Sequence, residues 1–120
     1  MTDLPPPLTA TLRSLLVDLA REGRTISYLD LALAADMTPP QVIHRVTEAL
    51  EILIREDHAS GRPLLAALAT RKAGDQPGRG FFLLLGELGL YDGPPEGPAA
   101  AECHARLLGS AIEYWSMANR

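Results

Sequence analysis

The sequence predicts a mainly α (α+β) fold: a winged helix-turn-helix-like core of three helices and a β-hairpin, followed by a C-terminal helix. Three observations predict it. Apolar residues recur at helical spacing in three stretches before residue 60. Two short apolar runs then flank a glycine- and proline-rich turn, and a Pro/Gly-rich linker over 92–98 precedes a last amphipathic stretch at 98–118. The 120 residues are expected to form a single domain (1–120), with the winged-helix-like core over 8–91.

The first helix is expected over residues 8–22. Its leucines follow the spacing i, i+4, i+7, i+8 and i+11 from Leu8 to Leu19, which forms one stripe of an amphipathic helix. Thr9 or Thr11 could cap its start. Gly23 suits the left-handed position that ends many helices, so the helix should stop there.

A short second helix should begin after Ser27. The Ser27 hydroxyl and Asp30, three residues later, resemble a capping box. The helix is expected to end at Asp36 and Met37.

The third helix has the clearest start signal. In Thr38-Pro39-Pro40-Gln41, threonine would be the N-cap, proline the first helical residue and glutamine its capping partner. The helix should run to about Asp57, before the break at 60–63. The apolar positions of its buried face are Val42, Val46, Ala49, Leu50, Leu53 and Ile54.

The hairpin is expected within residues 64–86. Leu64–Thr70 and Phe81–Leu85 are short apolar runs around the polar turn 73–80, and this arrangement is typical of a β-hairpin. Alanine and leucine form strands poorly, so part of the first run could be helical, as could residues 82–88. The residues expected in the core are Leu16, Ala32, Val46, Leu50, Leu53 and Phe81.

The stretch from Tyr28 to Val46 matches a helix-turn-helix pattern. Ala32, Met37 and Val42 supply its small and apolar positions at intervals of five. The turn prefers glycine where Asp36 stands, although aspartate is among the residues that tolerate a positive φ. A helix pair without any role on DNA uses the same positions, and the fold also serves protein contacts.

The first functional hypothesis is therefore a winged-helix DNA-binding or regulatory protein. Side chains at the start of the third helix would read base edges, and cations of the hairpin would bind phosphates. The net charge of −4 and the acidic residues along the third helix weaken this hypothesis. The candidate nucleic-acid-binding residues are Gln41, His44, Arg45, Arg71, Lys72 and Arg79.

The second hypothesis is a non-catalytic protein-interaction module on the same fold. Its contact surface would be the loop carrying Pro77, Gly78, Gly80 and Phe81, or the last helix. A homodimer is expected, because the apolar stripe of that helix needs a cover. The same stripe could instead dock within its own chain. The candidate dimer contacts are Leu108, Ile112 and Trp115.

The residues carry no recognisable catalytic or metal-binding pattern, so neither an enzyme nor a cofactor is expected. Phosphate-loop and dinucleotide-binding spacings are absent, as are paired metal ligands. Cys103 is the only cysteine, which excludes an intramolecular disulfide and favours a cytoplasmic location. No apolar run approaches the ~20 residues that span a membrane.

One stretch resembles a signature of small uncharacterised bacterial proteins. Their pattern is proline-leucine-leucine, a short apolar run, a lysine and then PGxGFF, with a tryptophan near the C-terminus. The matching residues here are Pro63, Leu64, Leu65, Lys72, Pro77, Gly78, Gly80, Phe81, Phe82 and Trp115. The resemblance covers about residues 25–116 and implies a shared winged-helix-like domain, with no function to carry over.

Overall fold

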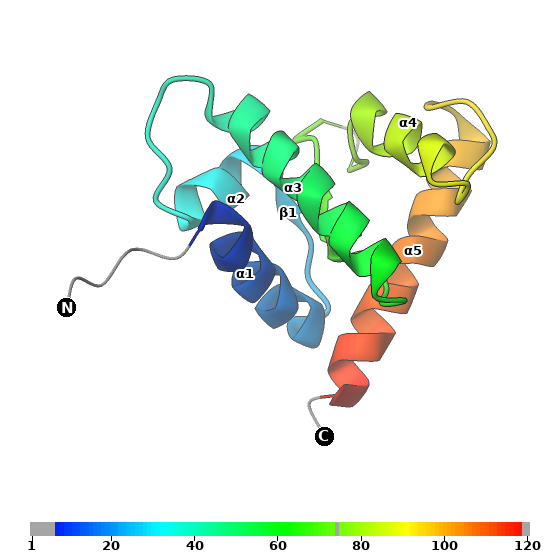
Figure 1. Ribbon diagram of the computed structural model, residues 1–120, viewed down its shortest axis with the longest axis horizontal. Coiled ribbons are helices and arrows are strands. Elements are labelled where there is room, and N and C mark those ends of the chain that lie inside the picture. The colour runs from blue at the N-terminus through cyan, green and yellow to red at the C-terminus, as the bar shows by residue number, and fades with distance from the viewer. Residues whose placement is uncertain (1–6, 74, 119–120) are drawn as a thin grey trace.

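The helices of the protein surround a buried segment at residues 64–70 (Figure 1). The computed structural model describes residues 7–73 and 75–118, so Gly74 of the expected turn lies outside the described residues. The chain is mainly helical. Its elements are α1 (Leu8–Glu22), β1 (Ile26–Ser27), α2 (Tyr28–Ala34), α3 (Val42–Ala59), a 3-10 helix η1 (Leu65–Leu68), β2 (Ala69–Thr70), α4 (Arg79–Glu87) and α5 (Pro98–Ala118).

Helix α1 has the predicted bounds, but its start is capped differently. Pro7 is the N-cap, and its carbonyl accepts hydrogen bonds from the backbone of Ala10 and Thr11. The prediction of a threonine cap was wrong, because Thr9 and Thr11 lie inside the helix. Gly23 ends α1 with φ 70°, as predicted.

Helix α2 begins and ends as the sequence indicated. The Ser27 hydroxyl accepts a hydrogen bond from the Asp30 amide at 3.1 Å. At the other end, Asp36 takes φ 57°, and its amide and that of Met37 bind the carbonyls of Leu33 and Ala32. This pair of bonds is a Schellman motif, in which aspartate occupies the position that usually takes glycine.

Helix α3 starts later than predicted. Gln41 is its N-cap, with φ 57° and no side-chain capping bond, and the first helical residue is Val42. The predicted capping box from Thr38 was wrong. A proline disfavours the α conformation of the residue before it, so Pro40 keeps Pro39 out of a helix. Gly61 ends the helix region with φ 70°.

The expected hairpin is not formed in residues 64–86 as far as they are described. Strand β2 pairs in parallel with β1, with Ile26 opposite Ala69 and Ser27 opposite Thr70. The second expected strand lies in helix α4. The prediction of a mainly helical chain is therefore confirmed, and the prediction of a β-hairpin wing was wrong.

The sequence of α4 explains why it is a helix. Phe81, Phe82, Leu84 and Leu85 are buried, whereas Leu83 is exposed. Buried positions at i, i+1, i+3 and i+4 follow a helical period, and a strand would bury alternate residues. Five consecutive apolar residues hide this difference in the sequence.

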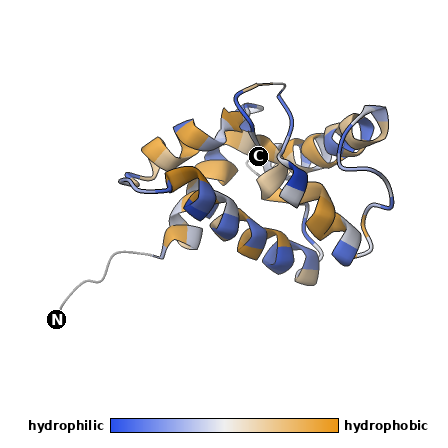
Figure 2. Cartoon of the chain, turned by 90° about the horizontal axis from the view of Figure 1, so that it is seen from above, coloured by the Kyte–Doolittle hydropathy of each residue, from blue (hydrophilic) through white to orange (hydrophobic). Residues whose placement is uncertain are grey.

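The buried segment 64–70 is the centre of the core. Its residues contact α1, α3 and α5 through η1, and every one of them is buried. Figure 2 shows that the surrounding helices carry both apolar and polar faces. All six residues predicted for the core are buried, from fully (Leu16, Ala32, Val46, Leu53) to 4% and 7% exposed (Leu50, Phe81).

Irregular backbone at the centre of a core needs polar partners. The Asp57 carboxylate accepts a hydrogen bond from the Leu65 amide at 3.2 Å. On the other side, the His104 ring lies 2.8 Å from the carbonyl of Ala67. These two buried polar side chains therefore replace the hydrogen bonds that a regular strand would make.

Helix α5 packs against α1 and η1 of its own chain. Its bounds agree with the prediction of 98–118. Within the described residues, no helix is long and apolar enough to cross a membrane.

Candidate functional site

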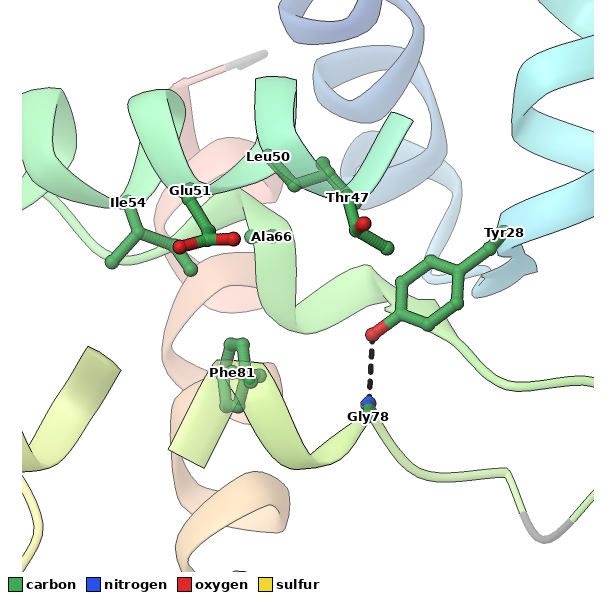
Figure 3. A pocket seen from close by; sticks show the side chains of 9 residues that line it. Tyr28, Thr47, Leu50, Glu51, Ile54, Ala66, Gly78 and Phe81 are labelled. Atoms are coloured by element: carbon green, nitrogen blue, oxygen red, sulfur yellow. Dashed lines mark hydrogen bonds between the residues drawn. The ribbon is translucent and has the colours of Figure 1, made fainter. Parts of the chain in front are cut away.

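A hollow of about 150 Å³ lies between α3 and the start of α4 (Figure 3). Tyr28, at the start of α2, and η1 complete its walls. Most of its lining is apolar, with three polar side chains among them. The lining residues are Tyr28, Thr47, Leu50, Glu51, Ile54, Ala66, Gly78, Gly80 and Phe81.

Tyr28 joins α2 to the residue that precedes α4. Its hydroxyl oxygen accepts a hydrogen bond from the Gly78 amide at 2.8 Å (Figure 3). Burial raises the pKa of the Tyr28 phenol, although this hydrogen bond and the charge of Arg71 act to lower it. The phenol is therefore protonated at neutral pH. Among the described residues no acceptor takes its O–H proton, which leaves a donor available to a ligand.

Glu51 is the one acidic side chain in this lining. It extends from α3 towards the hollow (Figure 3), and it is exposed. Its carboxylate has no ion-pair partner among the residues that the structure describes, whereas Glu48 on the same helix pairs with His44. Thr47 donates its hydroxyl to the carbonyl of His44, so it is already occupied.

The structure brings three of the four predicted interaction-loop residues into the hollow. Gly78, Gly80 and Phe81 line it, while Pro77 is fully buried. A Cβ atom at Gly80 would meet nothing within 4 Å, so there is open space for a side chain at this edge of the hollow. Tyr28 and Glu51 also line the site but had not been predicted there, because their neighbours in space are distant in sequence.

The predicted base-reading residues lie at the start of α3. Gln41, His44 and Arg45 are all exposed. The guanidinium of Arg45 donates to the carbonyls of Thr38 and Pro40, at 2.8 and 3.1 Å. Arg45 therefore holds the turn before α3, and His44 is engaged by Glu48.

The predicted phosphate-binding residues are not on a wing. Arg71 and Lys72 follow β2 and line a second hollow, together with Arg24, which was not predicted from the sequence. Arg79 is the first residue of α4 and lines neither hollow. Neither hollow contains residues from the start of α3, so the two predicted groups of nucleic-acid-binding residues are not brought together in one cavity.

A buried ion pair was also not predicted. The Arg13 guanidinium lies 2.6 Å from the Asp57 carboxylate and 2.9 Å from that of Glu56. Burial acts to lower the pKa of Arg13, but the hydrogen bonds to both carboxylates outweigh it and raise the pKa overall. Asp57 is fully buried and also binds the Leu65 backbone, so this pair belongs to the core rather than to a site.

The described residues offer no group of three or more histidine, cysteine or acidic side chains for a metal ion. Cys103 is buried, and this burial raises the pKa of its thiol, although Arg106 acts to lower it. A buried thiol with a raised pKa is a poor nucleophile.

The predicted dimer contacts lie on α5. Leu108 and Trp115 are partly buried and pack against the core of their own chain. Ile112 is partly buried as well. The stripe of these three residues is thus partly covered within its own chain. Docking within the chain was the alternative to a dimer. Homodimerisation stays a prediction.

Comparison of the chain with family models, with curated proteins and with solved structures finds no match.

Proposed function

We propose that this protein is a non-catalytic binding module, and that the hollow between α3 and α4 receives one apolar side chain of a peptide partner beside a positive charge. The observation that carries the proposal is the convergence of Tyr28, Glu51 and the loop around Gly78 on one hollow. This function corresponds to the second hypothesis from the sequence.

Size and lining select the side chain. A cavity of about 150 Å³ accommodates a benzene-sized group. The side chains of Leu50, Ile54 and Phe81 provide apolar contact for it. Burying an aromatic or aliphatic side chain contributes roughly 1.5–3 kcal/mol.

The polar groups of the hollow favour a particular kind of residue next to that side chain in the peptide. The Glu51 carboxylate has no ion-pair partner in the described part of the chain, and it favours a lysine or arginine beside the apolar residue. The Tyr28 hydroxyl can donate to a peptide carbonyl. An exposed ion pair adds at most about 1 kcal/mol, so a short peptide should bind with a Kd of roughly 1 mM or weaker.

The test uses two heptapeptides with a central phenylalanine, which is flanked by lysines in one peptide and by glutamates in the other. Amide chemical shifts of the protein are followed in a titration with each peptide. The lysine-flanked peptide should shift the amides of Thr47, Glu51 and Gly80, and the glutamate-flanked peptide should bind more weakly. Equal binding of both peptides, or shifts confined to other regions, would contradict the proposal.

Two variants with matched controls locate the site. Glu51→Gln should reduce the preference for lysine roughly threefold, because it removes the carboxylate. Glu113→Gln, an exposed change on α5, should leave that preference unchanged. Gly80→Leu should fill the entrance and abolish binding. Gly109→Leu, at a helical glycine whose added Cβ would also meet nothing within 4 Å, should not.

DNA binding is the second candidate, and one observation favours it. Asp36 takes the left-handed conformation that a helix-turn-helix requires, and Ala32 and Met37 are buried at the turn. The turn of residues 35–41 between α2 and α3 leaves the start of α3 exposed, where Gln41 and its neighbours lie.

A fluorescence titration of DNA at two salt concentrations tests this candidate. Binding through phosphates should weaken steeply with salt, and the variant Arg71→Ala with Lys72→Ala should lower that slope by roughly one unit for each phosphate interaction it removes. Arg45→Ala should instead relax the sequence preference. Absence of binding at ~50 mM salt would exclude the candidate.

A further inference from the structure

A second hollow, of about 330 Å³, lies along the paired strands β1 and β2. The parallel pairing brings the segment that contains β1 next to the residues that follow β2. The hollow is lined by Arg24, Thr25, Ile26, Ser27, Asp30, Thr70, Arg71, Lys72 and Asp75. None of these residues lines the first hollow, so the two hollows share no lining residue.

Positive charge outweighs negative charge in this lining. Arg24, Arg71 and Lys72 stand against Asp30 and Asp75, in a protein whose net charge is −4. Arg24 also pairs with Glu22 at 3.3 Å. Arg71 and Lys72 are exposed, and within residues 7–73 and 75–118 neither has an ion-pair partner. Two cations without an ion-pair partner therefore border one concave surface, which also carries two carboxylates.

Backbone hydrogen bonds fix the main chain at the first of these two cations. Thr70 is paired with Ser27 in the sheet, and the amide of Arg71 donates to the carbonyl of Gln76 at 2.8 Å. The backbone of Arg71 is thus fixed between the sheet and this hydrogen bond. The charge of Arg71 also acts on the Tyr28 phenol, lowering its pKa against the larger effect of burial.

We infer that this second hollow binds a phosphate group, either as inorganic phosphate or as the terminal phosphate of a small phosphomonoester. Guanidinium and ammonium groups donate to phosphate oxygens in charge-assisted hydrogen bonds. The hydroxyl of Thr25 adds a neutral donor from the same lining. A concave site suits a terminal phosphate better than a phosphodiester, whose two ester bonds continue the chain on both sides.

The test titrates the protein with sodium phosphate, and with sodium chloride at matched ionic strength, while amide chemical shifts are recorded. Phosphate should shift the amides of Thr25, Ser27 and Lys72 in a saturable manner, and chloride should not. A second arm uses phosphoserine as the monoester, and a third uses a short DNA duplex. Shifts that depend on ionic strength alone, or that arise only with the duplex, would overturn the inference.

Three variants, each of which removes one charge, should have different effects on the affinity for phosphate. Arg71→Gln should weaken phosphate binding roughly fivefold, and Asp75→Asn should strengthen it roughly threefold by removing a repulsive charge. Asparagine tolerates the φ of 52° at position 75, so the turn is preserved. Arg106→Gln removes an equal charge on α5, outside the hollow, and should leave the affinity unchanged. Equal effects of Arg71→Gln and Arg106→Gln would overturn the inference, because they would indicate a response to net charge.

Discussion

Residues 8–59 and residues 62–91 have similar proportions of apolar residues, but different kinds of contact determine their structures. In the first region each helix is defined by residues close to it. Gly23 and Asp36 end α1 and α2 through local backbone hydrogen bonds, and an apolar stripe defines the buried face of each. In the second region β2 pairs with a strand 43 residues earlier in the chain, as the register of Ile26 with Ala69 shows.

The difference shows where local signals determine structure and where they do not. An apolar stripe with a helical period predicted each helix of the first region, although the expected capping residues at the starts of α1 and α3 were wrong. A run such as Leu64–Leu68 is equally apolar on all sides, and the structure buries all of it. Its conformation depends on partners from elsewhere, namely Asp57 on α3 and His104 on α5.

The largest expected effect tests this dependence. Asp57→Asn should lower the free energy of unfolding by about 3 kcal/mol, since it breaks a buried ion pair and disturbs the bond to the Leu65 amide. Urea unfolding measures the change. Glu56→Gln is the matched control: it also contacts Arg13 but is exposed, so its effect should stay below about 1 kcal/mol. Similar losses of stability in the two variants would mean that residues 64–70 do not depend on the Asp57 side chain.

An intermediate effect tests the local rule in the first region. Asp36 has φ 57°, which glycine adopts freely and alanine does not. Asp36→Gly should therefore be more stable than Asp36→Ala by about 1 kcal/mol, measured by thermal unfolding of both variants. If alanine were as stable as glycine at this position, the turn after α2 would not be governed by its backbone conformation.

The smallest expected effect tests whether residues 79–87 are helical, as in the structure, or include the strand that the sequence predicted at Phe81–Leu85. Gly80→Ala should stabilise the protein by about 0.5–1 kcal/mol if this segment is helical, because alanine favours helices and its Cβ has free space. Gly109→Ala in α5 is an undisputed helical comparison and should give a similar gain. A loss of stability at position 80 alone would favour an extended conformation there.

The sequence could predict α1, α2 and α5 with their ends, and the burial of the six core residues. The capping signal at Thr38 predicted a start of α3 that was too early, because Pro40 disfavours the helical conformation of Pro39. The sequence could not predict the parallel pairing of β1 with β2, since two-residue strands have no pattern of their own.

For the candidate site, the loop residues Gly78, Gly80 and Phe81 were found from their turn and resemblance signals. Tyr28 and Glu51 were not. They meet the loop only because α2 and α3 pack beside it, and nothing near either residue in the sequence indicates this. Arg24 in the second hollow was not predicted for the same reason, because the strand pairing brings it there.

The contact between α1 and α5 has a consequence for the way the chain is made. Because synthesis runs from the N-terminus, α1 leaves the ribosome before α5. The packing surface of α1 is complete only when the residues of α5 have been synthesised. Until then, the face of α1 that packs on α5, which includes Ala20 beside Ser116, lacks its cover. We therefore expect α1 to reach its native packing only after α5 has been synthesised, with a nascent chain that exposes apolar surface until then.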